Sequence, residues 1–423
     1  MAASLTAFGD FSASFATISR IRTSGFTTTG RLSNMFDKSP LFALGFRPFY
    51  LIAAIFAALA IPLWVLSFPG EAQSGNYLHG LAWHSHEMIF GFAPAVIAGF
   101  LLTAVRNWTG QPTPIGAPLA GLVMLWLAGR VLMQTGPASV AAVMDILFLP
   151  TLGLAVAIPI WRSRNKRNYK VLAVLAFLTF VNIVYHLASL NLIPSGFARV
   201  SLTAALDVIA ILIAIVGGRV IPAFIGNAVK DSSPRHNRSV EIVSVGALIV
   251  ILALGVLAPW MPVSNTMWLS VFVVAAVGQF VRLLLWQPLR ALGNPLLWML
   301  PAAYAWLPIS LLLRALELQS LVPSGVAIHA FTVGTIASMM IAMMTRSALG
   351  HTGRPLVAGA AEIAAFILLQ LSAVVRVLAA SIASSAYREA MVVAGVLWAG
   401  AFAVFLWRYV PILMRPRIDS RPG

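Results

Sequence analysis

The chain has 423 residues, of which 60% are hydrophobic and only 9% are charged. Soluble globular domains carry about a quarter charged residues, so this composition excludes soluble and disordered proteins. The chain contains no cysteine, which excludes disulfides, thiolate metal sites and cysteine nucleophiles. The net charge is +16 at pH 7. Whether this charge indicates a binding partner depends on where the lysines and arginines lie along the chain.

Apolar runs long enough to cross a bilayer recur along most of the sequence. A membrane-spanning helix needs about 20 predominantly apolar residues, and we predict an all-α membrane bundle of about twelve such helices. Residues 1–40 form a predicted polar cytoplasmic tail, 41–412 a single transmembrane domain, and 413–423 a basic cytoplasmic tail. The predicted spans are 42–67, 83–105, 116–134, 138–161, 171–192, 200–225, 240–260, 266–286, 296–315, 324–345, 357–382 and 389–412.

Lysine and arginine gather in alternate connections between these spans. Basic residues are retained on the cytoplasmic side of short loops, so we expect both termini in the cytoplasm. This distribution makes the basic surplus a topology signal and argues against nucleic acid as a partner, although the same loops would attract anionic lipid headgroups of the bilayer. The basic residues that follow even-numbered spans are Arg106, Arg162, Arg164, Lys166, Arg167, Lys170, Lys230, Arg235, Arg238, Arg290, Arg354, Arg415, Arg417 and Arg421.

Most of the seven histidines fall at one expected depth, near the outer ends of their spans. Polar residues in hydrocarbon are costly and usually functional, and neutral imidazole is a common ligand of haem iron and copper. We therefore predict a metal or cofactor site near the outer face. His236 and His351 are assigned instead to cytoplasmic loops. The histidines at the outer level are His79, His84, His86, His186 and His329.

The spacing of the histidines in span two leaves two arrangements open. Residues two apart on a helix point about 200° away from each other, so His84 and His86 would serve two different sites. If the chain is irregular there, both imidazoles could instead bind one ion. Glu87 shares a helical face with His84 and could orient an imidazole or carry protons. A lone intramembrane histidine such as His186 is also often only a hydrogen-bonding group between helices.

Acids and arginines accompany the histidines at the same expected depth. Glu87, Asp145 and Asp207 are candidate catalytic proton carriers. Arg130 and Arg314, together with Arg376 in span eleven, are candidate cofactor-binding residues, because a guanidinium at this level would satisfy a haem propionate. Snorkelling of the arginine side chains to the interface is the alternative reading.

Six segments resemble the NnrS family, in motif order over about residues 40 to 412. The resemblance implies a polytopic protein of the bacterial inner membrane that contains haem and copper and acts in nitric oxide metabolism and nitrosative stress. The segments are 41–50 (LFALGFRPFY), 84–92 (HSHEMIFGF), 99–110 (GFLLTAVRNWTG), 218–224 (GRVIPAF), 329–334 (HAFTVG) and 345–355 (TRSALGHTGRP).

A fainter similarity links span two to the second helix of the haem-copper oxidase catalytic subunit, in which a histidine ligates the low-spin haem. About twelve spans match the core of that family, and an oxidase-like arrangement of the bundle is expected from the resemblance. The chain departs from the oxidases in spans six and seven, which lack paired histidines and the His-x-x-x-Tyr motif. A standard binuclear oxygen-reducing centre is therefore not expected.

These observations lead to a hypothesis for the bound cofactors. Haem b would be held by His329 and one of His84 and His86, while the other span-two histidine and His186, with Glu87 or His79, would bind copper or a second haem. Nitric oxide would be the ligand or the substrate of a metal-dependent oxidoreductase, with a quinol or a cytochrome as candidate electron donors. The alternatives are a non-catalytic nitric oxide sensor or scavenger and a proton-coupled transporter with an inverted repeat.

Overall fold

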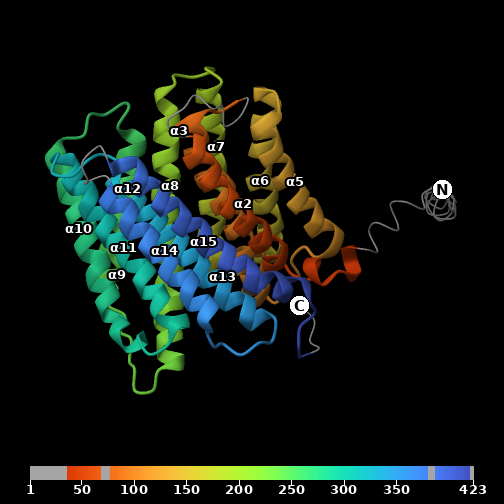
Figure 1. Ribbon diagram of the computed structural model, residues 1–423. Helices are drawn as coiled ribbons and strands as arrows, with labels where there is room; N and C mark the ends of the chain where they lie inside the picture. The colour runs from red at the N-terminus through yellow and green to blue at the C-terminus, as the bar shows by residue number, and fades with distance from the viewer. Residues whose placement is uncertain (1–35, 68–76, 380–385, 420–423) are drawn as a thin grey trace, which may run out of the picture.

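A computed structural model describes residues 36–67, 77–379 and 386–419 (Figure 1). Within these residues all regular structure is helical, and twelve helical segments are long and apolar enough to cross a membrane. The predicted all-α, multi-pass membrane bundle is thereby confirmed. Residues 1–35 of the predicted N-terminal tail and residues 420–423 of the predicted C-terminal tail lie outside the described residues.

Ten of the twelve spans contain one long helix each, and spans two and ten are composite. Span two consists of α3 (Gly80–His86), η3 (Glu87–Phe92) and α4 (Ala93–Thr109); span ten consists of α12 (Val326–His329), η6 (Ala330–Ala337) and α13 (Ser338–His351). Short turns are η2 (Pro40–Phe42), η4 (Lys166–Asn168) and η5 (Pro288–Ala291). The other helices are α2 (Phe46–Ser67), α5 (Gly116–Thr135), α6 (Ala138–Arg162), α7 (Tyr169–Ser189), α8 (Gly196–Ala228), α9 (Arg238–Leu257), α10 (Asn265–Leu285), α11 (Pro295–Leu318), α14 (Ala360–Ala379) and α15 (Tyr387–Met414).

The two composite spans lie at the centre of the bundle. The most apolar stretch of span two is 83% buried and that of span ten is 72% buried, whereas none of the other ten spans exceeds 61%. Helix α4 packs against α2 and α6, and α11 packs against all three segments of span ten. The spans that carry three of the outer-level histidines are therefore the ones most enclosed by protein.

The end of span ten differs from the sequence prediction, which ended the helix near residue 345. Helix α13 continues to His351, because the polar residues after Thr345 find partners inside the bundle. Arg346 lies over the ring of Phe224 in α8 at 3.8 Å, and the Ser347 hydroxyl donates to the Tyr50 hydroxyl of α2 at 3.1 Å. Assigning His351 to a loop was therefore wrong: it is the last residue of α13.

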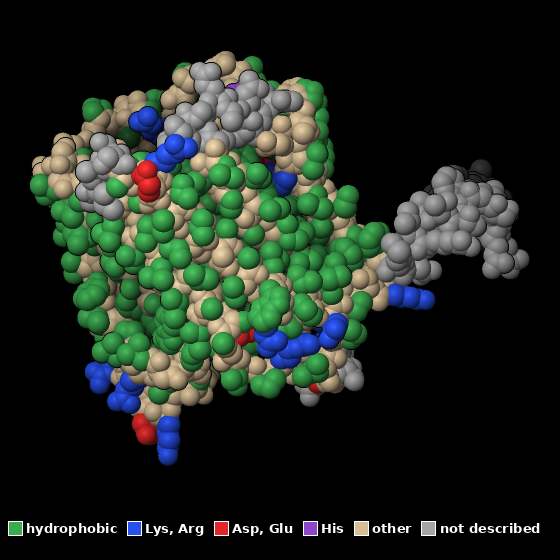
Figure 2. All heavy atoms as spheres, in the orientation of Figure 1, with side chains coloured by type: hydrophobic (Ala, Val, Ile, Leu, Met, Phe, Trp, Pro, Cys, Tyr) green, Lys and Arg blue, Asp and Glu red, His purple; other side chains and the backbone are tan. Residues whose placement is uncertain are grey.

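Connections that follow even-numbered spans meet one another at the same end of the bundle. Asn165 donates to the carbonyl of Trp108 at 3.0 Å, and the backbone of Arg235 donates to that of Leu285 at 2.9 Å. Figure 2 shows a broad hydrophobic band with charged side chains above and below it. The basic connections thus share one end, as alternating spans require, and α3 and α12 lie at the other end (Figure 1).

Candidate functional site

Helix α3 presents two histidines to opposite sides of span two. The ring of His84 stacks on Trp64 of α2, with ring centroids 4.1 Å apart. The ring of His86 packs instead between Phe90 and Tyr185, at 5.3 and 5.0 Å. The sequence left open whether the chain at His84 and His86 is a regular helix or irregular. The structure has the regular helix, so each histidine belongs to a different cluster.

His86, Asp145 and His186 bring three donor atoms together from α3, α6 and α7. Nε2 of His186 lies 3.0 Å from Oδ2 of Asp145, and Nε2 of His86 lies 3.3 Å from the same oxygen. One donor atom from each residue lies within 4.8 Å of the other two, and all three residues are buried. We call these residues the His–Asp–His group; its geometry could hold a metal ion.

The opposite nitrogen of each imidazole in this group also has a partner. Nδ1 of His86 donates to Oε1 of Glu87 at 3.1 Å, and Nδ1 of His186 is hydrogen-bonded to the Tyr77 hydroxyl at 3.2 Å. Such contacts fix the ring orientation and the tautomer of a metal-ligating histidine. The Asn182 amide donates to Oδ2 of Asp145 at 2.8 Å and holds the carboxylate in place.

Arg130 of α5 pairs with two carboxylates beside this group. Its Nη1 lies 2.6 Å from Oε1 of Glu87, and its Nη2 contacts Oδ1 of Asp145. The sequence predicted that Arg130 would bind a haem propionate. In the structure its guanidinium is paired with these two acids instead. With the histidines neutral, two carboxylates face one guanidinium, and this buried negative charge favours a bound cation.

A glycine makes room for Arg130. A Cβ at Gly91 would lie 2.6 Å from Nη1 of Arg130, closer than carbon and nitrogen can approach without contact strain. Gly91 belongs to η3, a π-helical segment that begins directly after His86. Segment η6 is also π-helical and begins directly after His329. Such segments are frequent at functional sites because the extra residue in the turn re-aims side chains.

The second cluster lies on the other side of α3. His329 of α12 and Arg376 of α14 are the electrostatic neighbours of His84. Nδ1 of His84 is buried with no hydrogen-bond partner among the described residues. Nδ1 of His329 lies 2.6 Å from the carbonyl of Gly325, to which it donates, so its Nε2 is the nitrogen left for a ligand. We call His84 and His329 the outer histidine pair; Arg376 lies near it.

Three of the residues singled out in the sequence lie outside the His–Asp–His group. Asp207 of α8 pairs with Arg314 of α11 at 2.6 Å, so neither reaches the His–Asp–His group. Arg314 was expected at a propionate and Asp207 as a proton carrier for the metal, but each has the other as its partner. His79, expected as an extra ligand, is exposed at the N-terminus of α3 and lies outside the His–Asp–His group.

Sequence reasoning missed two residues of this site and did not consider a third as a ligand. Asn182 lies one helical turn before His186, a spacing that places both on one face of α7, and this signal could have been used. Tyr77 precedes span two and carried no signal for its contact with His186. Asp145 was interpreted as a proton carrier, whereas its carboxylate faces both imidazoles as a potential ligand.

The fold and the site define a class: a multi-pass helical membrane protein with a buried histidine–carboxylate centre near one end of the bundle. A family model described as NnrS protein matches residues 40–417, nearly the whole chain. The chain therefore belongs to the NnrS family, as the sequence motifs predicted. A comparison with curated proteins finds no match.

Proposed function

We propose that this protein binds copper at the His–Asp–His group and haem b at the outer histidine pair, and that it binds or reduces nitric oxide at these metals. It would serve nitric oxide metabolism or defence against nitrosative stress. The observation that carries the proposal is the division of His84 and His86 between two clusters on opposite sides of one helix.

The donor set of the His–Asp–His group suits a single ion. Two imidazoles and a carboxylate, without thiolate, are typical ligands of copper, zinc and non-haem iron. The carboxylate of Asp145 lies within 3.3 Å of both imidazoles, so no porphyrin ring fits between the two histidines. This arrangement favours copper over a second haem, the two options that the sequence left open.

The outer histidine pair suits haem. The buried, unpartnered Nδ1 of His84 lacks the contact that a buried polar atom requires. The hydrogen bond from Nδ1 of His329 to Gly325 is the contact by which proteins orient a ligating imidazole. Arg376, which also contacts the Tyr387 hydroxyl at 3.3 Å, would replace Arg130 and Arg314 as the partner of a propionate.

The residues around the metal centre would control protons and water. When bound, such metals supply one-electron chemistry at nitric oxide. Glu87 holds both His86 and Arg130 and is the carboxylate left to move a proton, because Asp145 faces the ligand position. Phe90 and Tyr185 cover the ring of His86 and exclude water from this side.

A half-open apolar pocket between spans two, six and ten suits a small apolar gas. It has a volume of about 90 Å³ and an almost wholly apolar lining. Spans two, six and ten all contribute to it, through residues such as Val96, Leu212 and Met340. Nitric oxide partitions into apolar surroundings, so this pocket would hold the ligand within the membrane domain.

The basic connections support a location in the bacterial inner membrane with both termini in the cytoplasm. Because lysine and arginine stay on the cytoplasmic side, the two histidine clusters would lie near the periplasmic face. An oxidase-like arrangement of the spans, with a quinol or a cytochrome as electron donor, belongs to the same proposal.

The test is metal analysis and an absorption spectrum of the purified protein, oxidised, reduced, and reduced with nitric oxide. We expect copper, a haem b spectrum and a shift of that spectrum on adding nitric oxide. Consumption of nitric oxide with an electron donor would establish an oxidoreductase, and a shift without turnover a sensor or scavenger. A colourless protein without metal would overturn the proposal in favour of transport.

A further inference from the structure

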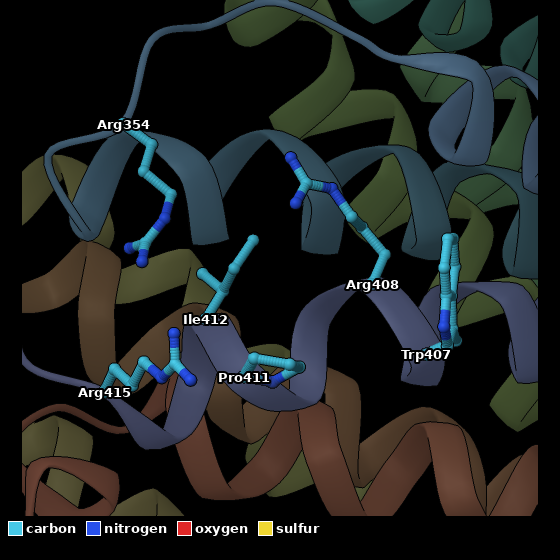
Figure 3. A pocket seen from close by; sticks show the side chains of 6 residues that line it. All are labelled: Arg354, Trp407, Arg408, Pro411, Ile412 and Arg415. Carbon is cyan, nitrogen blue, oxygen red and sulfur yellow. The ribbon is translucent and has the colours of Figure 1, made fainter.

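A cluster of arginines lies at the basic end of the bundle, the end opposite α3 and α12. Three arginines and three apolar residues line an open pocket of about 320 Å³. We call it the arginine pocket. Its lining residues are Arg354, Trp407, Arg408, Pro411, Ile412 and Arg415 (Figure 3).

Five of these six residues come from one face of the last helix. Counted from Trp407, they fall at positions 0, 1, 4, 5 and 8 of the end of α15 and its C-cap, and residues with this spacing share a face. Arg354 arrives from the connection between α13 and α14. Figure 3 shows the guanidinium groups of Arg354 and Arg415 converging on the space beside Ile412, with Arg408 on the other side of Ile412.

The pocket has more positive charge than its surroundings neutralise. Glu362 pairs with Arg408, with Oε1 3.2 Å from Nε, but the same oxygen also accepts from Tyr409. Within the described part of the chain, Arg354 and Arg415 form no ion pair, and Nη1 of Arg354 is buried without a hydrogen-bond partner. Burial, followed by the positive charges of Arg408 and Arg415, lowers the pKa of Arg354.

Basic residues that only set the membrane topology would not need to converge on one pocket. Basic side chains at a membrane surface normally spread apart and are solvated. Here the guanidinium groups of Arg354 and Arg415 converge beside a single pocket that Arg408 also lines. Guanidinium groups bind phosphate oxygens through paired hydrogen bonds. The chemistry of the pocket therefore suits an anion that carries a phosphate group.

We propose that the arginine pocket binds the phosphate of an anionic phospholipid from the leaflet at the basic end. Trp407 lies beside the pocket and is 76% exposed, and tryptophan concentrates at the level of lipid headgroups. Pro411 and Ile412 give the pocket an apolar floor on which a glycerol backbone can rest. These features favour a lipid over free phosphate, and basic pockets between spans at this face bind lipid headgroups in other membrane proteins.

The experiment measures lipid binding to the purified full-length protein in detergent. Short-chain phosphatidylglycerol is titrated against the wild type and the double variant Arg354→Gln/Arg415→Gln, with native mass spectrometry as the readout. The matched control is Arg235→Gln/Arg238→Gln, which removes two exposed arginines from the same end. We expect the pocket variant to lose at least tenfold in affinity and the control to stay within twofold of the wild type.

Two further measurements decide the source of the phosphate and the integrity of the variant. Trp407→Ala should weaken binding of phosphatidylglycerol, and inorganic phosphate at a hundredfold excess should leave the lipid bound. Displacement by inorganic phosphate would overturn the lipid assignment and indicate a free-phosphate site. Equal losses in both double variants, or equal binding of phosphatidylcholine, would overturn the site itself. An unchanged gel-filtration profile shows that the pocket variant is folded.

Discussion

Oδ2 of Asp145 lies 3.0 Å from Nε2 of His186, although the two residues are 41 positions apart and belong to different helices. His86 approaches the same oxygen from a third helix. The acid thus lies between two imidazoles, where it can serve as a ligand. Arg130 neutralises part of the charge of Asp145 and Glu87 and leaves the remainder for a cation.

Asp145→Asn should reduce bound copper at least tenfold. The substitution removes an anionic ligand and leaves Arg130 with one carboxylate, and changes around a metal commonly cost 10- to 100-fold in affinity. Metal analysis of the purified variant is the measurement. Asp207→Asn is the matched control, because Asp207 is also a buried carboxylate paired with an arginine. Equal copper loss in both variants would place the metal elsewhere.

Tyr77→Phe should weaken metal binding without removing a ligand. Burial raises the pKa of the Tyr77 hydroxyl to about 12, so the hydroxyl is neutral at pH 7 and keeps its hydrogen bond to His186. Losing that bond should lower metal affinity by about tenfold, measured by competition with a chelator. Tyr169→Phe, at a tyrosine that is 41% exposed, should leave the affinity unchanged; an unchanged affinity for Tyr77→Phe would exclude the orienting role.

Gly91→Ala should destabilise the protein by roughly 1–3 kcal/mol, the usual cost of overpacking. The new methyl group would push against Nη1 of Arg130 and loosen its contacts with the two acids. Gly121→Ala is the control, because nothing lies within 4 Å of a Cβ there and alanine favours a helix by roughly 0.5–1 kcal/mol. The free energy of unfolding in detergent is the measurement, and equal effects of both substitutions would rule out the contact with Arg130.

His329→Ala should abolish the haem absorption spectrum or change it markedly, while the copper content stays near that of the wild type. The two clusters lie on opposite sides of α3, so loss of one should spare the other. His236→Ala, at an exposed histidine in a connection, should leave both signals intact. An unaltered haem spectrum in His329→Ala would exclude this residue as an axial ligand.

Much of the membrane domain could be predicted from local features of the sequence. Hydropathy depends on composition over about 20 residues, which is why the twelve spans and most of their ends were found. The continuation of α13 to His351 was missed, because Arg346 and Ser347 look like interface residues until Phe224 and Tyr50, on other helices, provide their contacts.

The sequence by itself determined the family, the spans and the alternation of basic connections, because each depends on residues close together in the chain. Only the tertiary structure decided that His86 joins Asp145 and His186, that Arg130 meets two acids, and that three arginines share a pocket. Such partners depend on how each helix is rotated against its neighbours, and helix rotation is set by side-chain packing across the whole bundle.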